Sequence, residues 1–201
     1  MISALGLLRV IRAVECPAMT DKRELRSAMR AERKRLAGLD PAGSSRLADH
    51  VDELPSAEIV AIYRAIGSEI DTDALALALT SAGRGLCLPV VIAMDEPMIF
   101  RRWSPGDPLE LDAAGVPAPF PLAETVVPDL ILTPLLAFDA WGGRLGQGGG
   151  HYDRTFAAVP DTVRIGLAYA GQQVGMLELE PHDIRLHGVL TEVGYTPARK
   201  V

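Results

Sequence analysis

The chain has 201 residues, of which 48% are hydrophobic and 23% are charged, and its formal net charge is −6 at pH 7. These values are typical of one globular domain that buries a sizeable core, and they exclude a fibrous chain, a repeat array and an intrinsically disordered protein. The negative charge also argues against nucleic acid as the main partner.

The two cysteines, Cys16 and Cys87, are far apart in the sequence and form neither a disulfide framework nor a zinc motif. A reducing cytoplasm is the natural compartment for such a chain. The apolar stretch 2–11 is interrupted by Arg9, is too short to span a bilayer, and lacks the basic segment that precedes a secretory signal. We therefore expect a cytoplasmic protein without a membrane partner.

Residues 1–18 match no pattern in the chain that follows, and Met19 looks like a more natural start. We interpret 1–18 as a disordered extension or as the result of an upstream start codon. Residues 19–201 are then expected to form a single domain.

The first predicted element is a basic amphipathic helix that begins at Thr20 or Asp21, with Glu24 at the offset of a capping box. Its apolar face holds Leu25, Met29 and Leu36, and its other face holds Lys22, Arg26, Arg30 and Arg33. Charge patterning alone predicts that the basic face is solvated. Binding of a small polyanion such as a nucleotide is the alternative, because residues 1–50 hold ten of the twenty Lys and Arg of an otherwise acidic chain.

Helices and strands alternate along the rest of the chain. In order, we expect a helix over 44–54, a strand over 58–63, a helix over 74–81 capped by 71–73, a strand over 86–92 interrupted at Pro89, a strand over 98–103, a long surface loop over 104–121, a strand over 163–170, a short helix over 172–177 and a last strand over 189–195. This alternation predicts a single-domain layered α/β fold with a largely parallel central sheet flanked by helices. Ligands of such sheets bind beyond the carboxyl ends of the strands, where the loops 64–69 and 142–150 emerge.

The stretch 128–158 carries the strongest functional signal. Its apolar run 130–138 predicts a strand buried on both faces, six of the nine residues of 142–150 are glycine, and an apolar turn at 156–159 looks like the start of a short helix. A strand, a glycine loop and a helix start together point backbone N–H groups at an anion. Neither the dinucleotide fingerprint nor the P-loop pattern is present.

Two side chains favour phosphate binding over a loop that is merely flexible. Arg144, inside the loop, can donate to phosphate oxygens in a fork, and Asp153, after the loop, is a hard oxygen ligand suited to Mg²⁺. An Asp at the start of a helix also serves as a cap, so the sequence alone leaves a structural role for Asp153 open.

The motifs of this stretch closely resemble the signature of the 5-formyltetrahydrofolate cyclo-ligase family, whose members are also called 5,10-methenyltetrahydrofolate synthetases. The matching segments are LLAFD at 135–139, GRLG at 143–146 and GGGHYDR at 148–154. Lys22, Leu25 and Arg26 also match the Lys-x-x-Leu-Arg pattern with which members begin. At a coarse level the resemblance covers nearly all of residues 22–195.

Members of this family convert 5-formyltetrahydrofolate into 5,10-methenyltetrahydrofolate and consume ATP with Mg²⁺. The resemblance implies that the formyl oxygen attacks the γ-phosphate of ATP, that N10 of the folate then closes the ring, and that ADP and phosphate are released. Phosphoryl transfer of this kind needs from the protein mainly positioning and neutralisation of oxygen charge. ATP is thus the expected co-substrate, and Mg²⁺ the expected cofactor.

The resemblance also implies roles for individual residues. Arg144, Lys22 and Arg26 are expected to act on the transferring phosphoryl group. The expected ATP-binding residues are Lys22, Arg23, Glu24, Leu25, Arg26, Arg144, Leu145, Gly146, Gln147, Gly148, Gly149, Gly150, His151 and Tyr152. Arg64 and Glu69 are expected to bind the folate, and Asp153 and Asp183 to hold Mg²⁺. Without the resemblance, Glu69 would be interpreted as a solvated loop acid.

The chain departs from the family pattern at three positions. His151 replaces the first of two tyrosines, Gln147 stands where an aromatic or basic residue is common, and His187 stands where an acid is expected. The last departure puts the second metal ligand, Asp183, in doubt, since an Asp in a turn is usually structural. The alternative function is a non-catalytic folate-, nucleotide- or RNA-associated binding module of the same fold. We expect a monomer whose partners are small molecules.

Overall fold

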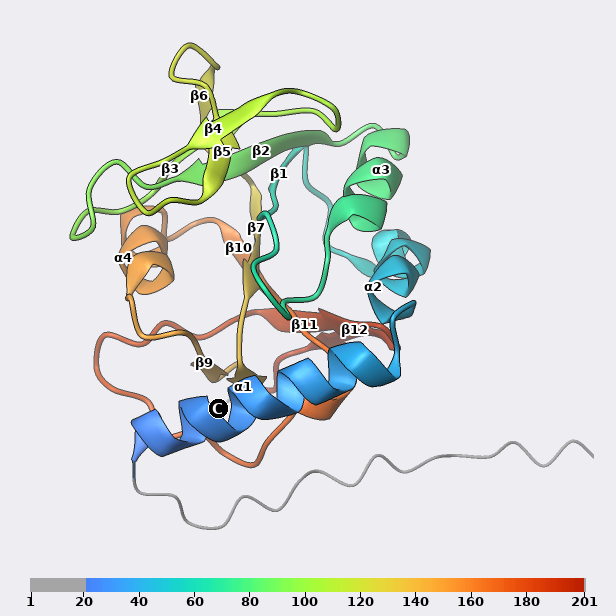
Figure 1. The fold of residues 1–201 in the computed structure, drawn as a ribbon, viewed down its shortest axis with the longest axis vertical. Helices are drawn as coiled ribbons and strands as arrows, with labels where there is room; N and C mark the ends of the chain where they lie inside the picture. Colours follow the sequence, from blue (N-terminus) through green and yellow to red (C-terminus); the bar gives the residue numbers. More distant parts are fainter. Residues whose placement is uncertain (1–20, 201) are drawn as a thin grey trace, which may run out of the picture.

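The structure is a computed structural model that describes residues 21–200 (Figure 1). The proposed extension 1–18 and the candidate cap Thr20 lie outside the described residues. The helices are α1 (Lys22–Leu39), α2 (Gly43–Arg46), the 3-10 helix η1 (Leu47–Glu53), α3 (Asp73–Ser81), α4 (His151–Ala158) and the 3-10 helix η2 (Ala170–Gln172). The strands are β1 (Ile59–Ala61), β2 (Gly85–Val90), β3 (Ile99–Arg102), β4 (Leu109–Leu111), β5 (Pro117–Pro119), β6 (Thr125–Val126), β7 (Leu130–Pro134), β8 (Ala137–Phe138), β9 (Arg144–Leu145), β10 (Val163–Leu167), β11 (Gly188–Thr191) and β12 (Gly194–Pro197).

Eight of these strands form one sheet in the order β12-β11-β10-β7-β1-β2-β3-β6. The central strands from β11 to β2 run parallel, and β12, β3 and β6 add to the edges in antiparallel fashion. The chain order reverses between β1 and β7, so the carboxyl ends of these two strands form the topological switch point at which open α/β sheets bind ligands. The predicted α/β fold with a largely parallel sheet is confirmed.

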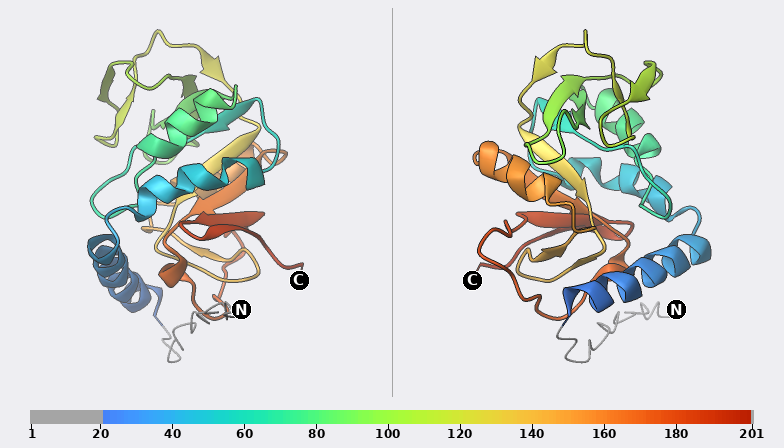
Figure 2. Two further views of the ribbon diagram at one scale, coloured as in Figure 1. Left: turned by 90° about the vertical axis from the view of Figure 1, so that its right-hand side faces the viewer. Right: turned by 60° about the vertical axis from the view of Figure 1, so that its left-hand side comes forward.

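The central strands are buried on both faces because successive side chains of a strand point to opposite sides. Along β7, Leu130 and Leu132 pack in a cluster with η1 and α3, whereas Ile131 packs in a second cluster that includes α4. β1 repeats the pattern, with Val60 in the first cluster and Ala61 in the second. Accordingly, α2 and α3 cover one side of the sheet and α4 the other (Figures 1 and 2).

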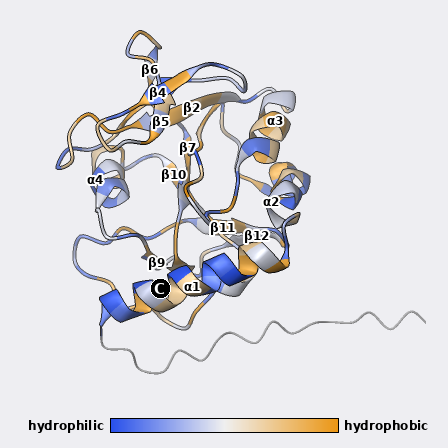
Figure 3. Ribbon diagram, in the orientation of Figure 1, coloured by the Kyte–Doolittle hydropathy of each residue, from blue (hydrophilic) through white to orange (hydrophobic). Residues whose placement is uncertain are grey.

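Helix α1 lies across the end of the sheet to which β7 leads (Figures 1 and 2). It begins where predicted, because the Asp21 carboxylate accepts a hydrogen bond from the Arg23 N–H at 2.8 Å and so caps the first turn. Leu25 and Met29 pack against the hairpin of β8 and β9. Figure 3 shows hydrophilic and hydrophobic segments alternating along this helix, as an amphipathic helix requires.

Several element boundaries differ from the prediction. The run 130–138 is two strands, because Pro134 ends β7 and the chain turns into β8. The helix after the glycine loop begins at His151, immediately after the last glycine, rather than at the apolar turn 156–159. The stretch 104–121 is not a plain loop, since it contains the antiparallel pair of β4 and β5.

The predictions for Pro89 and for the C-terminal third also need correction. Pro89 does not interrupt β2. Because β1 pairs with β2 only as far as Cys87, the pairing does not need an N–H group at position 89, which proline lacks. The predicted helix over 172–177 is wrong, because η2 ends at Gln172 and the chain is extended from Gln173. The last predicted strand is instead the hairpin of β11 and β12. No helix within residues 21–200 is long and apolar enough to cross a membrane.

We predict that Leu132→Ala lowers the free energy of unfolding by about 3 kcal/mol, because it opens a cavity in a well-packed core. Leu132 is 1% exposed and lies in β7, between β1 and β10. Urea unfolding followed by circular dichroism measures the change. The control is Leu122→Ala at a side chain that is 98% exposed, with an expected change of less than about 0.5 kcal/mol. Equal losses in the two variants would contradict this description of the core.

Candidate active site

A cleft of about 290 Å³ opens at the switch point of the sheet. Its walls come from α1, from the loop after β1, from the ends of β2 and β7, from the glycine loop with the start of α4, and from residues 180–183. The two loops expected at this edge, 64–69 and 142–150, both contribute to it. Segments that are far apart in the sequence thus meet around one cavity.

The glycine loop takes its shape from the hairpin before it and the helix after it. β8 and β9 pair, so the loop leaves the hairpin at Leu145. Gly148 and Gly150 have φ values of +103° and +68°, which residues with a side chain adopt rarely. α4 begins at His151, so its first N–H groups, which have no acceptor within the helix, belong to residues that line the cleft. This arrangement suits an anion.

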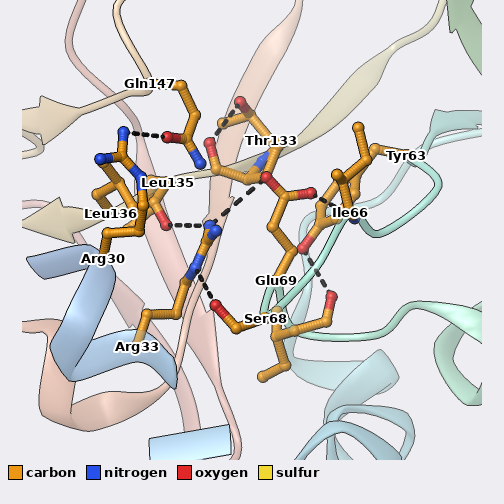
Figure 4. A network of polar contacts seen from close by, with 12 residues as sticks. Arg30, Arg33, Tyr63, Ile66, Ser68, Glu69, Thr133, Leu135, Leu136 and Gln147 are labelled. Atoms are coloured by element: carbon orange, nitrogen blue, oxygen red, sulfur yellow. Dashed lines mark hydrogen bonds and ion pairs between the residues drawn. The ribbon is translucent and has the colours of Figure 1, made fainter. Parts of the chain in front are cut away.

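The basic face of α1 is turned toward this loop. Lys22 and Arg26 line the cleft, and the Arg26 Nε donates to the Gly146 carbonyl at 3.1 Å. One turn further along, the Arg30 guanidinium donates to the Gln147 side-chain oxygen at 2.9 Å (Figure 4). The expectation from charge patterning, a solvated helix side, is therefore wrong for Lys22 and Arg26, whereas Arg30 is exposed as expected.

Arg144 and Asp153 form an ion pair at the cleft wall. The Arg144 guanidinium lies 2.7 Å from the Asp153 Oδ1, and the Arg144 side chain is only 6% exposed. Asp153 also accepts a hydrogen bond from the Ile184 N–H at 3.1 Å, so both of these partners lie outside its own helix. The Arg144 Nε is buried and has no hydrogen-bond partner among the described residues. An unpaired buried donor is unfavourable, and an anion bound in the cleft would offer the missing acceptor.

A second pairing joins α1 to the segment 180–183. The Lys22 ammonium lies 2.8 Å from the Asp183 carboxylate and 2.9 Å from the Glu180 carboxylate. Partial burial acts to raise the pKa of Asp183, but hydrogen bonds from Lys22 and from the Glu180 N–H outweigh it, and the pKa lies below its ordinary value. Burial likewise acts to lower the pKa of Lys22, and its two acidic partners raise it above the ordinary value. Both groups are therefore charged at neutral pH.

The opposite part of the cleft holds Glu69 beside two tyrosines. The Glu69 side chain is 8% exposed, so it is not the solvated loop acid that its position alone suggests. Burial raises the pKa of Tyr63 and of Tyr152 well above the ordinary value, and the Glu69 carboxylate adds to both shifts. Arg64 lines the cleft as well, where it pairs with Asp73 and lies 5.7 Å from the centre of the Trp103 ring.

Most of the predicted site residues come together here. The cleft is lined by Lys22, Arg26, Arg64, Glu69, Arg144, Leu145, Gly146, Gln147, Gly148, Gly149, Gly150, His151, Tyr152, Asp153 and Asp183. Three predicted ATP-binding residues do not line it: Arg23 and Glu24 are exposed, and Leu25 packs in the core beneath α1. His187 accepts a hydrogen bond from the Arg164 N–H at 3.0 Å and lies outside the cleft, so this departure changes no cleft residue.

Three polar residues that line the cleft were not predicted: Glu180, His182 and Asp112. Glu180 and His182 closely precede Asp183, so their proximity in the sequence was the available signal. The Asp112 carboxylate accepts from the nearby N–H groups of Ala114 and Val116 and from the distant N–H of Val91, and the last contact leaves no periodic signal.

Asp153 and Asp183, the two residues predicted to hold Mg²⁺, both line the cleft, and each is paired with a cation in this structure. Mg²⁺ commonly takes one or two carboxylates and completes its shell with water and substrate phosphate oxygens. Both carboxylates line the same cleft as the glycine loop. No cluster of three or more His, Cys, Asp or Glu side chains suited to a metal occurs in the part of the chain that the structure describes.

Known proteins share both the sequence and the fold. Residues 18–192 match the model of the 5-formyltetrahydrofolate cyclo-ligase family. The cyclo-ligase of Haemophilus influenzae is 35% identical over 145 residues, which cover 69% of this chain and 78% of that protein. The cyclo-ligase of Escherichia coli is 34% identical over 142 residues, which cover 67% and 78%.

Among solved structures, the 5,10-methenyltetrahydrofolate synthetase of Aquifex aeolicus superposes with a TM-score of 0.76 at 28% identity. The superposition covers 90% of this chain and 94% of that one. The family match spans the α1 cations, the glycine loop and both cleft aspartates. This chain belongs to the 5-formyltetrahydrofolate cyclo-ligase family.

Proposed function

We propose that this chain, a ligase of that family, converts 5-formyltetrahydrofolate into 5,10-methenyltetrahydrofolate with consumption of ATP in the presence of Mg²⁺. The observation that carries the proposal is a single cleft with two chemically different ends. One end offers cations and free N–H groups for a polyphosphate, and the other offers a buried carboxylate near two tyrosines. This division suits a nucleotide and a pterin bound side by side.

In the proposed reaction the formyl oxygen attacks the γ-phosphorus, and the bond from that phosphorus to the ADP oxygen breaks. The formyl C–O bond is then activated, since the oxygen leaves as phosphate. N10 attacks the formyl carbon and loses its proton, which closes the five-membered ring as phosphate departs. The chain contributes position and charge, as is usual for phosphoryl transfer.

At the nucleotide end, the N–H groups of the glycine loop and the start of α4 hold phosphate oxygens, and the Arg144 guanidinium neutralises the charge on the transferring group. Lys22 and Arg26 add positive charge from α1. Asp153 and Asp183 would hold Mg²⁺, which supplies further neutralisation of phosphate oxygens when bound.

At the folate end, Glu69 accepts hydrogen bonds from the ring donors of the pterin, and Arg64 binds substrate from the same loop. Apolar cleft residues exclude water from the reacting atoms; they include Pro89, Val91, Met98, Val116 and Pro134. Exclusion of water favours attack by the formyl oxygen over hydrolysis of ATP.

The first experiment mixes the purified protein with 5-formyltetrahydrofolate, Mg²⁺ and ATP and follows the near-ultraviolet absorbance of the methenyl product. We expect product that requires ATP and appears together with stoichiometric ADP. Binding of both ligands without product would instead favour the alternative of a non-catalytic folate- or nucleotide-binding module.

We predict that Arg144→Gln lowers kcat by about a hundredfold or more, because it removes a charged donor from the transferring phosphoryl group. Arg164→Gln is the matched control. Both guanidinium groups lie over the Phe156 ring, at 5.1 Å and 5.8 Å, but Arg164 does not line the cleft. Similar losses of kcat in both variants would show that the ring contact matters and that Arg144 has no role in catalysis.

We predict that Asp153→Asn raises the Mg²⁺ concentration required for half-maximal turnover by about tenfold, since it removes one anionic oxygen ligand. Turnover measured against Mg²⁺ at fixed ATP tests this. Asp161→Asn removes the same charge at an exposed position outside the cleft and is expected to leave the Mg²⁺ dependence unchanged. An unaltered Mg²⁺ dependence in Asp153→Asn would rule out the metal role.

A further inference from the structure

Arg33 is a buried cation that the proposed chemistry of the phosphates does not use. It lies on α1 and is 4% exposed, on the face that also buries Leu25 and Met29. Arginine is rarely buried to this extent unless its guanidinium is paired. Arg33 is not among the residues that line the cleft, so its partners must explain its position.

The partners of Arg33 are Ser68, Glu69 and Leu135 (Figure 4), of which Glu69 lines the cleft. The Arg33 Nε donates to the Ser68 hydroxyl at 3.2 Å, and its NH1 group lies 3.5 Å from the Glu69 Oε1 and 3.4 Å from the Leu135 carbonyl. Ser68 and Glu69 follow β1, and Leu135 follows β7, so Arg33 joins α1 to both sides of the switch point.

Glu69 is held from two directions. Arg33 approaches its Oε1, and the Ile66 N–H donates to its Oε2 at 3.0 Å (Figure 4). With a hydrogen bond at one oxygen and a cation 3.5 Å from the other, the orientation of the carboxylate is restricted. Its remaining lone pairs are available on the side that lines the cleft. A carboxylate held in this way matches an N–H and an exocyclic amino group that stand side by side on one ring edge, as they do in a pterin.

We propose that Arg33 is a positioning residue for folate recognition, which holds the Glu69 carboxylate in the orientation that accepts the paired donors of the pterin ring. The inference rests on the proposed function, because it takes the folate as the ligand of Glu69. Arg33 acts through Glu69 and touches neither substrate. Its loss therefore weakens folate binding and leaves nucleotide binding intact.

Calorimetric titration of the full chain with 5-formyltetrahydrofolate, and separately with ATP and Mg²⁺, tests this without turnover. We expect Arg33→Gln to raise the Kd of the folate about tenfold or more, the effect of losing a charged hydrogen-bond partner, with the Kd of ATP changed less than about twofold. Arg33→Lys is expected to restore part of the loss, because it keeps the charge but not the fork. The double variant Arg33→Gln/Glu69→Gln should bind folate no more weakly than Glu69→Gln alone.

The matched control is Arg35→Gln on the same helix, where Arg35 pairs with Glu32 at the surface at 2.6 Å. It is expected to change neither Kd. A purely structural role of Arg33 would displace α1, which also carries Lys22 and Arg26, and both Kd values would then rise together. A joint rise of both Kd values would overturn the proposal. So would an unchanged folate Kd in Arg33→Gln, or the absence of folate binding by the wild-type protein.

Two further outcomes are also decisive. If Arg33→Gln does not fold, Arg33→Lys carries the test, and equal Kd values for folate in Arg33→Lys and the wild type would overturn the proposal. If the wild-type protein binds folate, and more tightly than Arg33→Gln, but makes no methenyl product, the proposed reaction fails while the role of Arg33 stands.

Discussion

The candidate site depends on how helix α1 is rotated about its own axis. Leu25 and Met29 pack against the β8–β9 hairpin, and this apolar contact fixes the rotation. Because an α-helix turns by about 100° per residue, the same rotation directs Lys22 and Arg26 into the cleft and buries Arg33 beside Glu69. One amphipathic helix thus supplies charge to both ends of the cleft, although it lies outside the sheet.

Two cations of the cleft are already paired with acids. Arg144 pairs with Asp153, and Lys22 pairs with both Asp183 and Glu180, so neither group adds net positive charge to a partly buried cleft. On the proposed function, these pairs must exchange partners: the cations turn to phosphate oxygens and the carboxylates turn to Mg²⁺. A nucleotide that arrives with its metal satisfies all four groups at once. A nucleotide without the metal would leave both carboxylates facing phosphate.

How much of this could be predicted from the sequence depends on the range of the interaction. The Asp21 cap and the burial of β7 on both faces are local features, so residue patterns predict them, although the predicted strand 130–138 extends past the end of β7 and the predicted loop 142–150 contains β9. The η2 region was predicted incorrectly, because the Gln172 side chain donates to the carbonyls of Leu135 and Leu136, and such tertiary contacts leave no periodic signal. The family resemblance supplied the positions that pattern could not, Glu69 above all.

Arg33 shows where pattern and energetics diverge. Charge patterning groups it with Lys22, Arg26 and Arg30, and surface charge is the usual meaning of such a group. Helical spacing, however, places it one turn after Met29, on the face that is buried. Its side chain is 5% exposed and that of Glu69 is 8% exposed. A buried ion pair is poor evidence of stabilisation, since a well-packed apolar pair of similar volume is often at least as stable. A fold selected for stability alone would have no need of this pair. The pair lies beyond the carboxyl ends of β1 and β7, and Glu69 lines the cleft. Its presence there is explained if a ligand donates hydrogen bonds to the Glu69 carboxylate, which must then be both charged and held in one orientation.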